Sequence, residues 1–137
     1  MYLQENRLSG HIPKELGDLY NLEFMDLRDN QLSGSLPASL SGLLALTRLS
    51  LWGNAFEGVI PSELGNLANL KFQHLNQNKL IGQIPSTLGQ LTMLSELYLY
   101  DNPLLVGNVS SLCGTIEDIQ VDLPMIVCSC CVCCGRT

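Results

Sequence analysis

Cysteine has the most reactive side chain in this sequence, and five of the six cysteines lie within the last ten residues. Cys128 and Cys131 form one of several overlapping CxxC pairs, and four thiolates can hold zinc tetrahedrally. The spacing is too crowded for an ordinary zinc site, and no second CxxC pair lies at a distance. The alternatives are disulfides, since the number of cysteines is even, and acylation beside the apolar residues 125–127. From spacing alone, all three chemistries stay open.

Residues that could support catalysis are few. The sequence has no glycine-rich phosphate loop with a lysine, no HExxH motif and no nucleophile elbow. His11 is expected on a loop and His74 on the outward side of a strand. Two carboxylate pairs are expected at exposed positions as solvated charge: Asp26 with Asp29, and Glu117 with Asp118. We therefore expect no enzymatic activity and no cofactor.

Composition excludes further classes of protein. The balance of 7 basic against 13 acidic residues gives a net charge of −6, which argues against binding nucleic acid because phosphate contacts need clustered Lys and Arg. A hydrophobic fraction of 46% in 137 residues is typical of a folded domain with a real core. No apolar run reaches the ~18 residues of a membrane helix, so we expect no transmembrane segment in this chain.

The chain is organised by a repeat of 24 residues. Glycines, prolines and leucines keep this period, and each unit follows the pattern LxxLxLxxNxLxGxIPxxLGxL. The asparagines that mark the period are Asn6, Asn30, Asn54, Asn78 and Asn102. One column expected in the core consists of Leu8, Leu32, Phe56, Leu80 and Leu104. One unit cannot bury its leucines alone, so the repeat predicts stacked units with a continuous core.

Within a unit, the LxL segment predicts a short parallel strand. Leu49 and Leu51 point inward, whereas Arg48, Ser50 and Trp52 point outward. The asparagine follows at the corner, where both ends of its amide can bond backbone groups, so stacked units would form an asparagine ladder. Residues 119–123 still alternate and predict a last, degenerate strand that closes the core.

The repeat resembles the plant-type leucine-rich repeat of receptor kinases, receptor-like proteins and polygalacturonase inhibitors, over residues 1–112. The resemblance implies an α/β solenoid, a right-handed horseshoe with parallel strands on its concave face and irregular or 3-10 structure on its convex side. It also implies a non-catalytic module, extracellular or at the cell surface, that binds a protein, peptide or cell-wall glycan on the concave face. Roles in receptor ectodomains, adhesion or defence signalling fit this pattern. The alternatives are inhibition of a secreted hydrolase, and thiol or metal binding through the cysteine tail.

The two ends of the chain carry separate expectations. Residues 113–137 are expected to form a C-terminal cap, and the tail resembles the cysteine clusters of diatom-like algal leucine-rich-repeat proteins. Extracellular repeats are the commoner context for such cysteines, so we favour disulfides over a metal site or lipidation. Met1 falls inside a strand with no polar cap, so we expect a fragment of a longer protein, membrane-anchored if an upstream segment spans a membrane. Asn108, in the only N-glycosylation sequon, would fit a secreted chain. The disulfide candidates are Cys113, Cys128, Cys130, Cys131, Cys133 and Cys134.

The outward strand positions form the expected ligand-binding face. Six of the eight aromatic residues fall there, and exposed aromatics beside arginine are common anchors of protein interfaces. The alternative is that these rings only favour strand structure and cover the sheet. The candidate binding residues are Tyr2, Phe24, Asp26, Arg28, Arg48, Trp52, Phe72, His74, Glu96, Tyr98 and Tyr100.

One expected core position holds a polar residue. Gln73 occupies a column filled elsewhere by Met1, Met25, Leu49 and Leu97. A buried amide without a partner costs roughly 1–3 kcal/mol. We therefore predict that Gln73 is a tolerated defect of the core.

Overall fold

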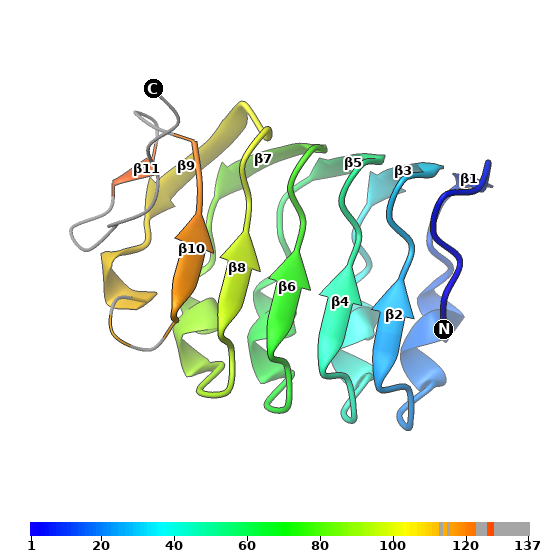
Figure 1. The fold of residues 1–137 in the computed structure, drawn as a ribbon, viewed down its shortest axis with the longest axis horizontal. Coiled ribbons are helices and arrows are strands. Elements are labelled where there is room, and N and C mark those ends of the chain that lie inside the picture. Colours follow the sequence, from blue (N-terminus) through cyan, green and yellow to red (C-terminus); the bar gives the residue numbers. More distant parts are fainter. Residues whose placement is uncertain (113, 115, 123–125, 128–137) are drawn as a thin grey trace.

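The computed structural model describes residues 1–112, 114, 116–122 and 126–127, and they form a solenoid (Figure 1). A complete turn contains a strand of a first sheet, a corner, a strand of a second sheet and a 3-10 helix. All strand pairings are parallel. The predicted solenoid, with parallel strands on one side and 3-10 structure on the other, is confirmed. All six cysteines lie outside the described residues, so the expectations about them are neither supported nor contradicted.

The first sheet contains the predicted LxL strands. Its strands are β2 (Phe24–Asp26), β4 (Arg48–Ser50), β6 (Phe72–His74), β8 (Glu96–Tyr98) and β10 (Asp118–Gln120). They lie side by side in chain order, and Tyr2 adds an isolated parallel bridge to Asp26 before β2 (Figure 1). Residues 24 apart pair from β2 to β8, as Phe24 does with Arg48. Strand β10 overlaps the predicted last strand, residues 119–123, at Ile119 and Gln120 only. Its Asp118 pairs with Glu96 because the last turn is two residues shorter.

The return path forms a second parallel sheet that the sequence pattern did not predict. Its strands are β1 (Ser9–Gly10), β3 (Gln31–Ser35), β5 (Ala55–Gly58), β7 (Lys79–Gln83), β9 (Leu104–Asn108) and β11 (Ile126–Val127). Gly34, Gly58 and Gly82 lie in these strands at φ of 76°, 77° and 79°. This left-handed conformation is unstrained only for glycine, which explains why glycine keeps the 24-residue period.

An inserted residue shifts the register of the second sheet between β7 and β9. Ser33 pairs with Ala55, 22 residues later, whereas Gly82 pairs with Leu105, 23 residues later. Leu105 consequently takes the core position and is 1% exposed, while Leu104 is 64% exposed. The prediction that Leu104 belongs to the core column was therefore wrong by one residue.

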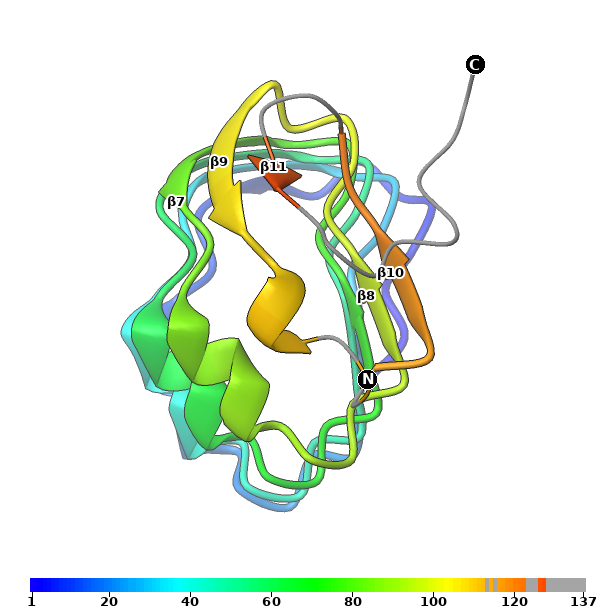
Figure 2. The same cartoon turned by 90° about the vertical axis from the view of Figure 1, so that its left-hand side faces the viewer.

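The convex side consists of short 3-10 helices. They are η1 (Lys14–Asp18), η2 (Ala38–Gly42), η3 (Ser62–Asn66), η4 (Ser86–Gln90) and η5 (Ser110–Leu112). A proline in extended conformation precedes each of η1 to η4, which suits a residue that has no N–H to donate. Viewed along the solenoid, these helices lie opposite the first sheet, and the second sheet connects the two sides (Figure 2). In the described part of the chain, no helix has the length and apolar character needed to cross a membrane.

Leucines from every turn fill the space between the sheets and the helices. Leu49, Leu51, Phe56 and Leu97 are fully buried, and they belong to one apolar cluster that runs through the described turns. Burial of this apolar surface is the main force that holds the turns together, since neighbouring units share each leucine layer. The first sheet is thereby fixed as a firm support for its outward side chains.

Candidate ligand-binding face

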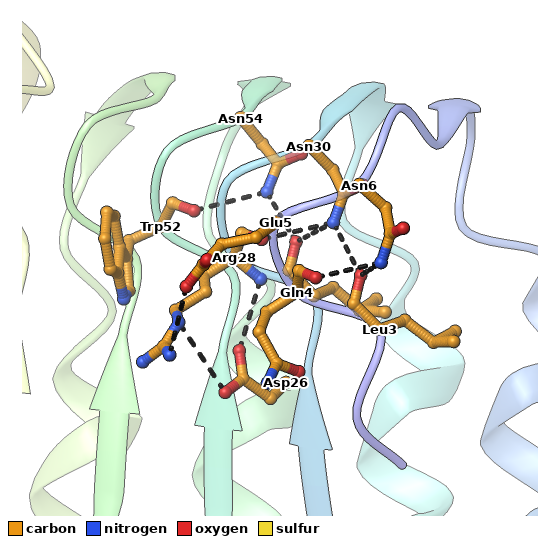
Figure 3. Close-up of polar contacts among 10 residues, drawn as sticks. Leu3, Gln4, Glu5, Asn6, Asp26, Arg28, Asn30, Trp52 and Asn54 are labelled. Atoms are coloured by element: carbon orange, nitrogen blue, oxygen red, sulfur yellow. Dashed lines mark hydrogen bonds and ion pairs between the residues drawn. The ribbon is translucent and has the colours of Figure 1, made fainter.

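An asparagine at the end of each LxL segment fixes the corner beside the face. Asn78 Nδ2 donates to the carbonyl oxygens of Leu75 and Asn76 in its own turn and of Leu51 in the preceding turn, each at 3.1 Å. Its Oδ1 accepts the N–H of Phe56 at 3.0 Å. Figure 3 shows the same amide ladder at the first corners, around Asn6, Asn30 and Asn54. The ladder holds successive strands in register and so sets the spacing of the outward side chains.

The residue just before the asparagine has a left-handed backbone in every turn. The column consists of Glu5, Asp29, Gly53, Gln77 and Asp101, with φ between 51° and 67°. This conformation is uncommon for residues other than glycine and costs of order 1 kcal/mol or more. The surrounding hydrogen bonds maintain it, and the turn carries acidic side chains to the edge of the face.

Alternation along the strands places the candidate residues on the outward side of the first sheet. Outward residues at equivalent positions of successive turns form two columns, and each column alternates between aromatic and polar side chains. Where one column has an aromatic residue, the other has a polar or charged residue. The first column is Phe24, Arg48, Phe72 and Glu96, and the second is Arg28, Trp52, Asn76 and Tyr100. We call the outward side of the first sheet, which contains these two columns, the alternating face. It offers a flat ring next to a polar or charged group wherever two strands meet.

Arg28 is the centre of the polar contacts near the first strand (Figure 3). Its guanidinium lies 3.6 Å from Glu5 and 3.8 Å from Asp26, and 5.8 Å from the centroid of the Trp52 ring. Asp26 Oδ1 also accepts the backbone N–H of Arg28 at 3.3 Å. Asp26 is therefore buried, at 7% exposure, and the expectation of an exposed, solvated carboxylate was wrong. Arg28 covers it.

Aromatic contacts continue across the face. Tyr2 stacks with Phe24 at 6.3 Å between centroids, and both rings are exposed. The Arg48 guanidinium lies 4.5 Å from the centroid of the Phe72 ring, within the range of a cation–π contact. A flat ring with a cation above it is a preorganised contact surface, because few rotamers need to be fixed on binding.

The densest network lies on β6, β8 and β10. The His74 and Tyr98 rings stack at 4.4 Å with an interplanar angle of 7°. His74 Nε2 is 3.0 Å from Glu96 Oε2, and the Tyr98 hydroxyl donates to Asp118 Oδ2 at 2.7 Å. Gln120 Nε2 also donates to Asp118 Oδ2, at 3.2 Å. Three strands are thus joined through their outward side chains.

Burial controls the protonation of this network. It lowers the pKa of His74 below its ordinary value of 6.5, although the nearby Glu96 acts in the opposite direction. His74 is therefore neutral at neutral pH. Burial, and next the hydrogen bond to Asp118, raise the pKa of Tyr98, which stays a protonated donor. The network consequently has the two negative charges of Glu96 and Asp118 and no positive charge of its own.

Sequence reasoning did not select three residues of this face. Asp118, expected as solvated charge, and Gln120, not among the predicted binding residues, both lie on the outward side, as the alternation over residues 119–123 implies. The same alternation points Asn76 outward, but it is not among the candidate binding residues predicted from the sequence. It is only 3% exposed, and its Oδ1 has no hydrogen-bond partner among the described residues. A sequence pattern cannot reveal that orphaned oxygen.

Comparisons with known proteins identify the fold independently. The Leucine Rich Repeat family model matches residues 21–43 and 45–67. The plant peptide hormone receptor RGFR1 in complex with RGF2 is 38% identical over 90% of this chain, with a TM-score of 0.86. The Arabidopsis receptor kinase HAESA, in complex with the peptide hormone IDA and the co-receptor SERK1, is 30% identical over 92% of this chain, with a TM-score of 0.79. The chain spans 20% and 25% of these two structures.

A smaller relative is matched over most of its own length. The BIR3–SERK2 complex from Arabidopsis thaliana contains a chain that is 34% identical, with a TM-score of 0.76. That match covers 94% of this chain and 72% of the relative. A comparison with curated protein sequences finds no match. The repeat pattern, the solenoid and these similarities agree, and the chain belongs to the plant-type leucine-rich-repeat family.

Proposed function

We propose that this chain is a non-catalytic recognition module that binds an extended peptide, or an extended segment of a protein, on the alternating face. The observation that carries the proposal is the position of the aromatic residues. Six of eight lie on the outward side of the first sheet, while leucine fills the core. Strand propensity alone does not explain that bias, because inward strand positions would accept rings equally well. Interfaces, in contrast, concentrate aromatics and arginine.

The size of the face favours a peptide over a large globular surface. Strands lie about 4.8 Å apart, so the five strands of the first sheet and the Tyr2 bridge span roughly 24 Å. Two of the similar structures are complexes with peptide hormones, RGF2 and IDA. A receptor-like role outside the cell or at its surface is consistent with these similarities. The exposed Asn108 would then be accessible for glycosylation.

A displayed library of random dodecapeptides tests this proposal. The full chain is used for selection, and the affinities of enriched peptides are measured by calorimetry for the wild type and for a Trp52→Ala/Tyr100→Ala double variant. We expect the double variant to bind at least tenfold more weakly, because truncation of a central aromatic anchor typically costs about 2 kcal/mol. Circular dichroism establishes whether the variant retains its fold.

Tyr20→Ala is the matched control, because Tyr20 is an exposed aromatic on the return path and not on the alternating face. It should leave the affinities unchanged. Selection that enriches no peptide, or peptides whose binding does not depend on Trp52 and Tyr100, would refute the proposal. A panel of secreted hydrolases, assayed with and without the chain, tests the alternative of an inhibitor.

A further inference from the structure

His74 lies on β6, the middle strand of the first sheet, and points outward on the alternating face (Figure 1). Its side chain is 16% exposed, so part of the ring remains open to a molecule that lies on the face. The other histidine of the chain, His11, precedes the 3-10 helix η1 and is outside this sheet. His74 is therefore the residue of the face whose charge can change near neutral pH.

The contact of His74 with Glu96 determines which ring nitrogen carries the proton. Nε2 lies 3.0 Å from Glu96 Oε2. An ionised carboxylate can only accept a hydrogen bond, so Nε2 must be the N–H of the neutral ring. Nδ1 is then a bare acceptor, which is not fully buried and has no hydrogen-bond partner among the described residues. A peptide N–H that lies against the ring would supply this partner.

A proton on Nδ1 reverses that property. The protonated ring has a donor at both nitrogens and a positive charge, so Nδ1 can no longer accept a peptide N–H. Nε2 still faces Glu96, now as an ion pair, and the flat stack on Tyr98 supports the ring from the side. Tyr98 is itself held by Asp118, which accepts its hydroxyl on β10. These contacts keep the ring in place, so protonation changes mainly what Nδ1 offers to a ligand.

Charged groups on the neighbouring strands act on His74 in opposite directions. Glu96 on β8 and Asp26 on β2 favour its positive charge, whereas Arg48 on β4 opposes it. Burial is the strongest influence and holds the pKa of His74 below 6.5. The ring is therefore neutral at pH 7.5 and gains its proton only under acidic conditions.

We propose that His74 is a contact of the peptide that a proton switches off: the neutral ring accepts a peptide N–H at Nδ1, and acidification removes this contact and weakens binding. The inference rests on the proposed function and names how binding to that face is regulated. A peptide and a proton compete for Nδ1, so binding releases a proton wherever the free chain is protonated there. One pH unit below the pKa of His74, about one chain in ten has a neutral ring, so the apparent Kd rises up to about tenfold.

Calorimetry from pH 7.5 to 5.0 tests this inference with peptides that do not titrate. The dodecapeptides are selected at pH 7.5 from a library without histidine, aspartate or glutamate, and enriched peptides are synthesised with blocked termini. We expect the Kd of the wild type to rise about fivefold or more by pH 5.0. Titrations in buffers of different ionisation enthalpy should show that binding at acidic pH releases a proton. Circular dichroism at each pH separates loss of binding from loss of the fold.

Two histidine variants identify the group responsible. His74→Gln retains an acceptor oxygen that does not titrate, so the ratio of its Kd at pH 5.0 to its Kd at pH 7.5 should stay below about two. His11→Gln removes an imidazole outside the face and is the matched control. It should retain the rise in Kd that the wild type shows on acidification.

Nitrogen NMR of the imidazole ring provides a readout that does not depend on a folded His74 variant. Nitrogen chemical shifts distinguish a protonated from a bare ring nitrogen, and His11→Gln assigns the signals. At pH 7.5 we expect a protonated Nε2 and a bare Nδ1 in His74, and a change at Nδ1 when a peptide binds. The opposite tautomer would overturn the inference.

The possible outcomes separate the two proposals. Peptides that require Trp52 and Tyr100 but bind equally well at pH 7.5 and 5.0 would overturn this inference and leave the proposed function standing. A pH dependence that persists in His74→Gln would overturn it as well. If no peptide binds the face, both proposals fail.

Discussion

At the scale of single residues, Gln73 is a polar side chain in the middle of a leucine core. It is 0% exposed, and neither end of its amide has a hydrogen-bond partner among the described residues. Its strand neighbours in the register are Leu49 and Leu97. We therefore expect Gln73→Leu to increase the free energy of unfolding by about 1–3 kcal/mol, because it removes two buried unpaired polar groups. Thermal and urea denaturation measure the change.

The reverse substitution at the neighbouring position is the matched control. Leu49→Gln introduces a second unpaired amide into the same column and should lower the melting temperature by several degrees. A decrease in stability for Gln73→Leu would contradict the interpretation. It would mean that the amide has a role that its surroundings do not reveal.

His74 makes stability depend on pH. Burial lowers its pKa in the folded chain below the ordinary 6.5, so below pH 6.5 the unfolded chain binds a proton more readily than the folded one. The contribution of neutral His74 to the free energy of unfolding is therefore complete above pH 6.5. It is lost as the pH falls toward the pKa of His74 in the folded chain. We expect the free energy of unfolding to decline from pH 7.5 to 5.5, and His74→Gln to remove part of that decline. Urea titrations at both pH values test this.

The exposed His11 supplies the comparison. His11→Gln changes the same residue type at an exposed position outside the face and is the matched control for the loss of an imidazole. Identical pH profiles for His74→Gln and the wild type would show that His74 is not the group responsible.

At the scale of elements, the asparagine corners join the first sheet to the second. Asn78 is buried and makes four hydrogen bonds, whereas Asn6 is exposed and its side chain makes two, both within its own turn. We expect Asn78→Ala to lower the free energy of unfolding by about 2–4 kcal/mol, because it leaves buried backbone groups unpaired. Asn6→Ala should cost less than 1 kcal/mol. Equal losses for the two variants would disprove this account of the ladder.

The first sheet could be predicted from the sequence, whereas the second could not. Alternation in segments such as residues 48–52 specifies which side chains point inward, and the period of 24 specifies the pairing. In β3, only Leu32 of five residues is buried, and Gly34 is left-handed. That pattern lacks the alternation by which a strand is recognised. The second sheet forms because the asparagine ladder and the stacked leucines bring the return segments within hydrogen-bonding distance.

At the scale of the whole molecule, the sequence predicted where the face lies better than how its members interact. The outward position of His74 followed from the repeat, but its stacking on Tyr98 depends on χ angles, and its pKa depends on burial. Likewise, that Asn76 is 3% exposed and that its Oδ1 lacks a hydrogen-bond partner among the described residues depend on packing. Leu104 was misplaced because a single inserted residue reverses the inward and outward positions of a strand. Backbone periodicity is thus recorded in the sequence, while side-chain partnerships arise from packing.

The alternating face also has a geometric consequence for any peptide that runs along the solenoid axis. Strands are about 4.8 Å apart, and an extended peptide advances about 3.3 Å per residue, so two strand steps nearly equal three peptide residues. Aromatic residues of one column recur every second turn of the solenoid, as Trp52 and Tyr100 do just after β4 and β8. The distance between aromatic residues two turns apart on the face therefore nearly equals the length of three residues of an extended peptide. In such a peptide, the side chains at positions i and i+3 would both lie beside aromatic residues of the face. A shift of the peptide by one residue would move both side chains away from these aromatic residues.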